Sequence, residues 1–143
     1  MTLAKTQWES LIPHQGAMSL LDEVIEWNDD GIVMRAISHR APDNPLRSDG
    51  MLRGVHLCEY GAQAMAVHGG LLAQRDGGVA RPGFLVSLRA VKIGAARIDQ
   101  LDGALTVRAD KLLAGDTGWQ YAFRIEHAGR VIAEGRAAVV HGS

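Results

Sequence analysis

The sequence has a single cysteine, no long apolar run and no excess of charge of one sign. One cysteine, Cys58, excludes an intrachain disulfide and a multi-cysteine zinc site. No apolar run approaches the roughly 20 residues that a membrane-spanning helix needs, and Met1–Thr6 lack the apolar stretch of a secretory signal. With 15 Lys and Arg against 16 Asp and Glu, a formal charge of -1 predicts neither nucleic acid nor an anionic membrane as a partner. We therefore expect a cytoplasmic protein with one domain, 1–143.

Motifs that bind common cofactors are also missing. The chain has no phosphate-binding loop, no dinucleotide-binding glycine-rich turn and no His-x-x-x-His or Glu-x-x-His zinc pattern. It has no Gly-x-Ser-x-Gly nucleophile turn either. We therefore expect no cofactor and no metal. Cys58 is interpreted as a core thiol, because its neighbours are mostly apolar.

The distribution of apolar residues predicts one long helix between two groups of strands. Leu52–Gln74 has no proline, many good helix formers and apolar side chains almost all round, which is typical of a buried helix. Gly77 and Gly78 end it. A short helix is expected before the turn at Leu11–Gly16, and Ala41–Gly50 is expected to be a loop. The expected strands are 18–27, 32–37, 84–93, 105–110, 119–126 and 131–139.

Short turns join several of these strands, so we expect the joined strands to be antiparallel neighbours. Asn28–Gly31 separates the first two strands, and Asp116–Gly118 and Ala128–Gly129 separate the last three. An order of two strands, one buried helix and about four strands predicts an α+β protein. An antiparallel sheet wrapped around one central helix, the hotdog fold, agrees with this order because it buries both the helix and one sheet face.

Glu59 is the most informative polar residue of the predicted helix. The residues around it, from Val55 to Ala62, are mostly apolar, so that an ionised carboxylate there is costly unless it has a partner. Carboxylates in such surroundings cluster at functional sites. An exposed stripe of the helix, or a structural ion pair with an arginine, is the alternative interpretation.

Two further polar residues share a helix stripe with Glu59. His56 lies three residues before it and Gln63 four residues after it. An acid–base site with a positioning amide has this pattern, and so does the solvated side of a helix. For His56 the beginning of the helix makes an exposed position the alternative to a catalytic one.

Several segments resemble the 3-hydroxyacyl-acyl carrier protein dehydratases of the FabZ and FabA type. Leu11–Val24 is similar to their opening, where a Leu-Pro-His segment leads into an apolar strand ending in Asp-x-Val. Gly54–Ala64 is similar to their helix, with a Gly-Val start and a Glu and a Gln four residues apart. Asp99–Leu101 precedes a strand, as in the family. The resemblance extends over nearly the whole chain, and the most similar subgroup is the ApeP-like group from aryl-polyene-type biosynthetic clusters.

This resemblance implies an activity and a set of site residues. The activity is elimination of water from a 3-hydroxyacyl thioester to give the enoyl thioester, in fatty acid or polyene-type biosynthesis. The substrate is the acyl-phosphopantetheine of an acyl carrier protein, and no cofactor is used. Glu59 would be the acid, and backbone N–H groups at the helix start would stabilise the thioester oxygen. The expected substrate-binding residues are Gly54, Val55, Gln63, Phe84, Leu85 and Val86.

The histidine base of the family has no counterpart at the matching position. In the family it lies in a Gly-His-Phe-Pro-Gly loop fourteen residues before the helix glutamate. Fourteen residues before Glu59 stands Pro45, and residues 44–50 contain no histidine. His56 is therefore the catalytic candidate beside Glu59, while His14, His39 and the other histidines are no safe replacement. We expect the base to come from a second hotdog chain, which would complete a composite site.

The expected partners follow from the helix and from the substrate. The helix is apolar on more sides than one sheet can cover, so we expect a homodimer, or a heterodimer with a second hotdog protein. Carrier proteins are acidic, so the entrance of the site should be locally basic. The candidate carrier-protein contacts are Arg47, Arg53, Arg89 and Lys92. Ordinary surface positions are the alternative for these four residues.

Three other functions remain open from the sequence. A non-catalytic subunit that binds and stabilises an active dehydratase agrees with the missing histidine. In a hotdog acyl thioesterase, Glu59 would activate water instead. A plain acyl-binding module is the third alternative. Acyl chain length and pathway are not determined by the sequence.

Overall fold

The structure of the chain is a computed structural model that describes residues 2–78 and 83–141. One α-helix, α1 (Leu57–Arg75), follows a 3-10 turn at Gly54–His56 and is the longest helix of the described chain. Further 3-10 turns lie at Lys5–Gln7, Glu9–Leu11, Gly16–Met18 and Ser38–Arg40. The strands are β1 (Leu3–Ala4), β2 (Glu23–Trp27), β3 (Gly31–Ala36), β4 (Gly83–Ile93), β5 (Leu105–Ala114), β6 (Gly118–His127) and β7 (Arg130–His141).

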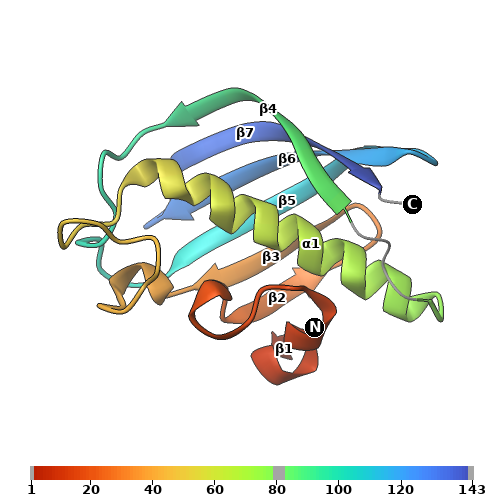
Figure 1. Cartoon of the computed structure of the whole chain (residues 1–143), viewed down its shortest axis with the longest axis horizontal. Coiled ribbons are helices and arrows are strands. Elements are labelled where there is room, and N and C mark those ends of the chain that lie inside the picture. Colours follow the sequence, from red (N-terminus) through yellow and green to blue (C-terminus); the bar gives the residue numbers. More distant parts are fainter. Residues whose placement is uncertain (1, 79–82, 142–143) are drawn as a thin grey trace.

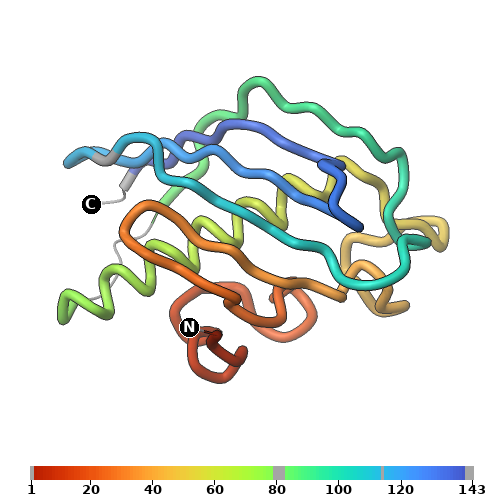
Figure 2. The backbone as a smooth tube through the Cα atoms, turned by 180° about the vertical axis from the view of Figure 1, so that it is seen from behind, coloured from red at the N-terminus to blue at the C-terminus, as the bar shows by residue number. Residues whose placement is uncertain are grey.

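The strands form one sheet in the order β1-β2-β3-β5-β6-β7-β4, with every pair antiparallel. Helix α1 lies along one face of this sheet, as Figure 1 shows, and the opposite face is open in the view from behind in Figure 2. The expected α+β architecture, an antiparallel sheet around one long central helix, is therefore confirmed. No helix among the described residues is long and apolar enough to cross a membrane.

Small residues on α1 let the helix lie directly against the aromatic side chains of β6. A Cβ atom added at Gly61 would lie 2.7 Å from the ring of Phe123, and one added at Gly69 would lie 2.5 Å from the ring of Trp119. Real Cβ atoms do not approach so closely, so glycine is required at both contacts. Tyr121, between the two aromatics on β6, is fully buried. The aromatic series therefore packs the sheet against the helix.

The expected hairpins are present, and the helix starts later than expected. Asn28 closes the β2–β3 turn, because its side chain accepts hydrogen bonds from the N–H groups of Asp30 and Gly31. The helix begins at Leu57 rather than Leu52, since the preceding turn is bound to another segment: Gly54 N–H donates to the Ala96 carbonyl, 2.9 Å away. Gly77, with φ of +81°, ends the helix as expected.

The N-terminal segment differs from the expected short helix. It consists of two 3-10 turns, at Lys5–Gln7 and Glu9–Leu11, that flank a completely buried Trp8. A buried indole between two short turns fixes the path of this segment more strongly than helix propensity does, because burial of a large aromatic side chain is worth more than the propensity differences of a few residues. This path places the segment after Leu11 beside α1, where a Cβ atom added at Gly70 would lie 2.8 Å from Cβ of Leu11.

Strand β4 is the edge of the sheet next to β7, and it is irregular. Its register shifts twice against β7, between Leu85 and Ser87 and between Arg89 and Lys92, and Ala90 has a φ of +53°. Such bulges bend a strand, and Figure 1 shows β4 bending over α1. The edge of β4 that faces away from β7 has no strand beside it in the described chain. The large apolar side chains that β4 exposes are Phe84, Leu85, Val86, Leu88, Val91 and Ile93.

Candidate active site

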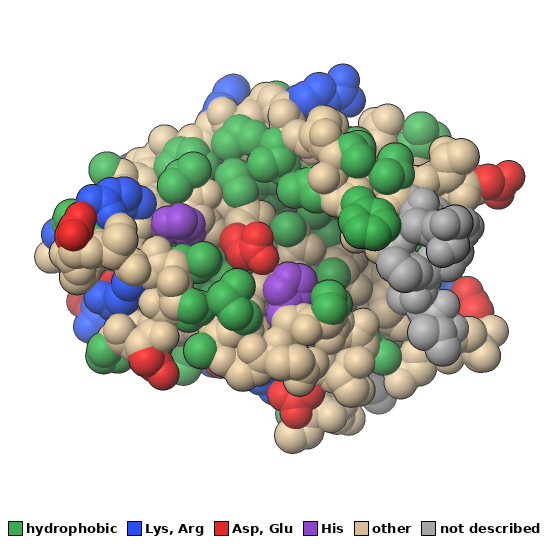
Figure 3. Space-filling model, in the orientation of Figure 1, with side chains coloured by type: hydrophobic (Ala, Val, Ile, Leu, Met, Phe, Trp, Pro, Cys, Tyr) green, Lys and Arg blue, Asp and Glu red, His purple; other side chains and the backbone are tan. Residues whose placement is uncertain are grey.

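A cavity of about 590 Å³ lies beside α1, between the helix, the N-terminal segment, the start of β4 and the strands β6 and β7. Figure 3 shows hydrophobic side chains gathered on the face of the molecule where α1 and β4 lie. A volume of this size is typical of sites that hold small molecules. Its lining residues are Leu11, Pro13, His14, Glu59, Ala62, Met65, Ala66, Gly69, Gly83, Phe84, Leu85, Trp119, Tyr121 and Val139.

Glu59 and His14 are the ionisable acid and base of this lining. Nε2 of His14 lies 3.4 Å from Oε1 of Glu59, and the two side chains are 27% and 36% exposed. Glu59 is in the first turn of α1, where a carboxylate interacts favourably with the helix dipole. Nδ1 of His14 is buried and has no hydrogen-bond partner in the described chain. The pair combines a carboxylate and an imidazole, the two side chains most used in proton transfer, within reach of one bound molecule.

Gln63 supports this pair from within the protein. Its side chain is completely buried and accepts a hydrogen bond from Leu20 N–H at 2.9 Å. Its amide nitrogen donates to the Met18 carbonyl at 2.7 Å and approaches Oε1 of Glu59 at 3.4 Å. Gln63 therefore holds the segment after His14 against α1 and positions the Glu59 carboxylate. It is not among the residues that line the cavity.

His56, expected beside Glu59, lies at the end of the 3-10 turn that precedes α1 and does not line the cavity. The structure thus brings together Glu59 and Gln63 of the expected stripe, and it adds His14 in place of His56. His39 is completely buried, with Nε2 at 2.9 Å from the Leu101 carbonyl, and takes no part in the cavity. Catalysis by His56 stays a prediction.

Of the other expected substrate-binding residues, some line the cavity and some do not. Phe84 and Leu85 line the cavity, whereas Val86 does not and is 57% exposed. Gly54 N–H is already donated to the Ala96 carbonyl, so it has no free hydrogen for a thioester oxygen in this structure. Val55 is 59% exposed, directly before α1.

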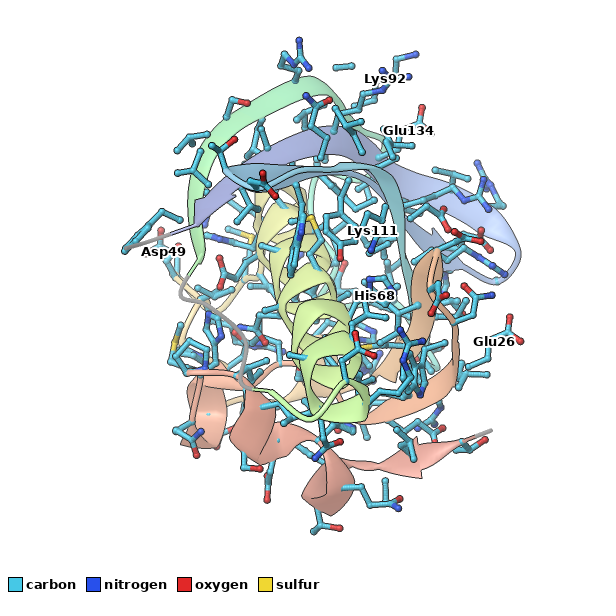
Figure 4. The ribbon with its side chains drawn as sticks, turned by 90° about the vertical axis from the view of Figure 1, so that its right-hand side faces the viewer. Glu26, Asp49, His68, Lys92, Lys111 and Glu134 are labelled. Carbon is cyan, nitrogen blue, oxygen red and sulfur yellow. The ribbon has the colours of Figure 1, made fainter. Side chains whose placement is uncertain are left out.

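The four basic residues expected at the entrance have different surroundings. Arg47 is held in its loop, where its guanidinium donates to the carbonyls of Ala41, Gly50 and His39. Arg53 donates to Ser48 Oγ at 2.7 Å and keeps a side chain that is 43% exposed. Arg89 and Lys92 are on β4, and Figure 4 shows Lys92 and Glu134 on the outside of the sheet, away from α1.

The far part of the cavity contains one polar side chain, Tyr121, whose hydroxyl is hydrogen-bonded within the protein. Tyr121 Oη lies 2.7 Å from Nδ1 of His68, and Nε2 of His68 lies 2.7 Å from the Asn28 carbonyl. The carbonyl can only accept, so this network assigns the ring proton to Nε2 and makes Tyr121 the donor to Nδ1. Burial lowers the pKa of His68 and raises the pKa of Tyr121, which keeps both groups neutral.

Comparisons with known proteins agree with this fold. Similar solved structures are the dehydratase heterocomplex ApeI:P from Xenorhabdus doucetiae (24% identity, 94% of this chain and 90% of that chain, TM-score 0.84) and zebra fish thioesterase superfamily member 2 (18%, 96% and 95%, TM-score 0.65). A third is a hypothetical thioesterase protein from Streptococcus pneumoniae, solved with coenzyme A (14%, 98% and 98%, TM-score 0.65). The fold is therefore the hotdog fold of dehydratases and thioesterases.

A comparison of the sequence with models of protein families identifies the family within this fold. Residues 6–143 match the model of the ApeP-like family, described as ApeP dehydratase. The chain belongs to this family of hotdog dehydratases, which confirms the resemblance noted above. A comparison with curated proteins found no match.

His14 is the site residue that the sequence pattern did not single out. It is 45 residues before Glu59 and follows Pro13 in a segment without regular structure, so no periodicity connects the two residues. The one available signal was the similarity of the Leu-Ile-Pro-His segment to the family, and there the corresponding histidine is not the base. Only the packing of the N-terminal segment on α1 brings the two side chains together.

Proposed function

We propose that this chain takes part in the dehydration of 3-hydroxyacyl thioesters carried by acyl carrier protein, with Glu59 as the proton donor. The observation that supports this most strongly is the position of Glu59 and His14 at a partly exposed part of an otherwise apolar cavity. An apolar cavity takes up an acyl chain, and the carboxylate and imidazole then face the carbons next to the thioester. Membership of a dehydratase family agrees with this assignment.

The reaction requires one base and one acid on the same short stretch of substrate. The base removes a proton from C2, and the electron pair of that C–H bond becomes the C2–C3 double bond. The C3–O bond breaks, and the acid gives the leaving hydroxyl a proton, so that the products are an enoyl thioester and water. Glu59 is the acid that supplies this proton in the proposal.

The base is proposed to come from a second hotdog chain. Residues 44–50 of this chain contain no histidine, so the base that the family supplies from this loop is missing here. The similar structure from Xenorhabdus doucetiae is a dehydratase heterocomplex. The free edge of β4, with its row of exposed apolar side chains, begins at the cavity wall and is the surface proposed for the partner.

His14 is the alternative base, because it lies 3.4 Å from Glu59 within the same chain. A chain that used His14 would be active without a different partner. The two arrangements therefore differ in which protein must be present and in which histidine the reaction needs.

A dehydration assay separates these possibilities. The purified chain, alone and mixed with a hotdog chain that has the histidine loop, is incubated with 3-hydroxyacyl-carrier protein, and loss of water is followed by mass spectrometry. We expect turnover in the mixture and about 10²- to 10⁴-fold less with Glu59→Gln. Glu26→Gln, at an exposed position on β2, is the matched control and should leave turnover unchanged.

The outcomes assign the base and test the function. Turnover by this chain alone that is lost with His14→Ala would make His14 the base and exclude the composite site. Release of free thiol from saturated acyl thioesters, without dehydration, would instead identify a thioesterase. A mixture in which Glu59→Gln keeps full activity would contradict the role of Glu59 and leave a stabilising subunit as the function.

The carrier protein is proposed to approach over Arg53 and Arg89. A cationic surface accelerates the encounter with an acidic partner and makes it dependent on salt. Replacing both residues with Glu should weaken binding of acyl carrier protein at least tenfold at low ionic strength, and the difference should shrink as salt is added. Isothermal titration at two salt concentrations measures this. Equal affinities of the wild-type chain and the double variant for acyl carrier protein at low salt would exclude this surface.

A further inference from the structure

Five residues of α1 line the cavity: Glu59, Ala62, Met65, Ala66 and Gly69. Met65 is almost completely buried, and the other four follow one line along the helix. Glu59, Ala62, Ala66 and Gly69 are spaced by three, four and three residues, so they lie on one side of α1. Beyond Glu59 each residue of this line is small. The line therefore forms a trough in the helix surface that starts at the carboxylate and continues toward β6.

The trough ends where Trp119 meets the helix. A Cβ atom added at Gly69 would lie 2.5 Å from Cζ3 and 2.8 Å from Cη2 of the Trp119 indole. The indole therefore touches the helix backbone, and no chain can pass between them. Tyr121, on the same side of β6, is buried and its hydroxyl hydrogen is donated to His68, so it has no hydrogen left to donate to a ligand there.

We propose that Trp119, seated on Gly69, limits the length of the acyl chain that this site accepts, at about twelve carbons. This proposal rests on the proposed function, because it assumes that Glu59 marks the position of C3. It makes Trp119 and Ala66 the residues that determine chain-length specificity.

The length follows from helix geometry. The ten residues from Glu59 to Gly69 span ~15 Å at 1.5 Å per residue. A carbon atom stops about 3.5–4.0 Å short of the atom it contacts, which leaves about 11 Å. An extended peptide advances ~3.3–3.6 Å for its three backbone bonds, or about 1.2 Å per bond, and an alkyl chain has similar geometry. About nine bonds beyond C3 therefore fit, which gives an acyl chain of about twelve carbons.

A larger side chain at Ala66 should shorten the limit. Ala66 is seven residues from Glu59, or ~10.5 Å along the helix, and a Leu there would leave room for about five bonds beyond C3. The limit should move to about eight carbons. Each methylene that is no longer buried weakens binding by about fourfold, so a twelve-carbon chain should bind on the order of a hundredfold more weakly, while a six-carbon chain should be unaffected.

Binding, rather than turnover, is the measurement that tests this proposal. Acyl-pantetheine amides with 4 to 16 carbons are titrated into the purified chain by calorimetry. We expect affinity to rise with length up to about twelve carbons and then to stop rising. Ala66→Leu should move this break to about eight carbons, and Trp119→Ala should move it beyond twelve. Ala73→Leu, the same change at a half-buried position of α1 outside the cavity, is the matched control.

The results separate failure of this inference from failure of the proposed function. If affinity stops rising at the same chain length in Ala66→Leu and Trp119→Ala as in the wild type, Trp119 does not limit the acyl chain. The same conclusion follows if Ala73→Leu shifts this length as much as Ala66→Leu does. Either result would overturn the inference even when Glu59 is essential for dehydration. Absence of binding at every length, or affinity independent of length, would also overturn the inference. Tighter binding of a sixteen-carbon chain by Trp119→Ala is a gain that a misfolded protein cannot produce.

Discussion

At the scale of single residues, Glu59 and Gln63 are one helical turn apart, but only Gln63 is expected to contribute strongly to the free energy of unfolding. Glu59 is partly exposed beside His14, while Gln63 is buried and bonded to the backbone at Leu20 and Met18. A near-isosteric apolar change, Gln63→Met, leaves the buried Leu20 N–H and the part-buried Met18 carbonyl without their partner. A buried group of this kind costs about 1–3 kcal/mol and a part-buried one about 1 kcal/mol, so the free energy of unfolding should fall by about 2–4 kcal/mol in urea titrations. Glu59→Gln serves as the comparison and should change it by less than about 0.5 kcal/mol.

The buried histidines predict how stability depends on pH. Burial lowers the pKa of both His39 and His68 below the ordinary value. The unfolded chain therefore binds protons that the folded chain does not, so stability is complete above about pH 6.5 and is lost as the pH falls below it. The loss is at most about 1.4 kcal/mol per pH unit for each residue. Unfolding titrations between pH 7.5 and 5 should show a smaller slope for His68→Gln. An unchanged slope in both His68→Gln and His39→Gln would contradict this origin.

At the scale of secondary-structure elements, the β6–β7 hairpin contains a residue in a conformation that it does not favour. Ala128 and Gly129 both have positive φ, 51° and 78°, as a two-residue hairpin turn of type I′ requires. Asn adopts this conformation more readily than Ala, so Ala128→Asn should raise the free energy of unfolding by about 1 kcal/mol. The same change at Ala138, in the middle of β7, should lower it, since Asn is disfavoured in strands. Thermal unfolding of the two variants measures the difference. A destabilised Ala128→Asn protein would contradict the idea that the positive φ of Ala128 costs stability.

At the scale of the whole molecule, the edge strand β4 predicts an assembly. An exposed apolar edge strand pairs readily with another chain, and the side chains of β4 include a Val86 that is 57% exposed. Light scattering at micromolar concentration should give twice the chain mass of 15.4 kDa. Val86→Lys should shift the protein toward the single-chain mass. Val131→Lys, also at an exposed valine but on β7, should not. A wild-type protein that is already monomeric would exclude this dimer.

The local patterns of the sequence determined most of the fold. Alternation of apolar and polar residues, glycine at turns and an uninterrupted run of helix formers depend on neighbours within a few positions. These patterns predicted α1, the three hairpins and the strands from β2 onward. The segment that fails is the N-terminal one, where burial of Trp8 replaces an expected helix with 3-10 turns. Glu59 and Gln63 were found for the same local reason, since four residues of helix place them side by side.

Only the tertiary structure decided which histidine meets Glu59. His14 reaches it across 45 residues of sequence, because Gln63 binds the backbone at Met18 and Leu20 and holds the N-terminal segment on α1. His56, three residues away in sequence, remains in the turn before the helix and outside the cavity. The cavity and its end at Trp119 have the same origin: they depend on how distant segments pack, which no periodicity in the chain records.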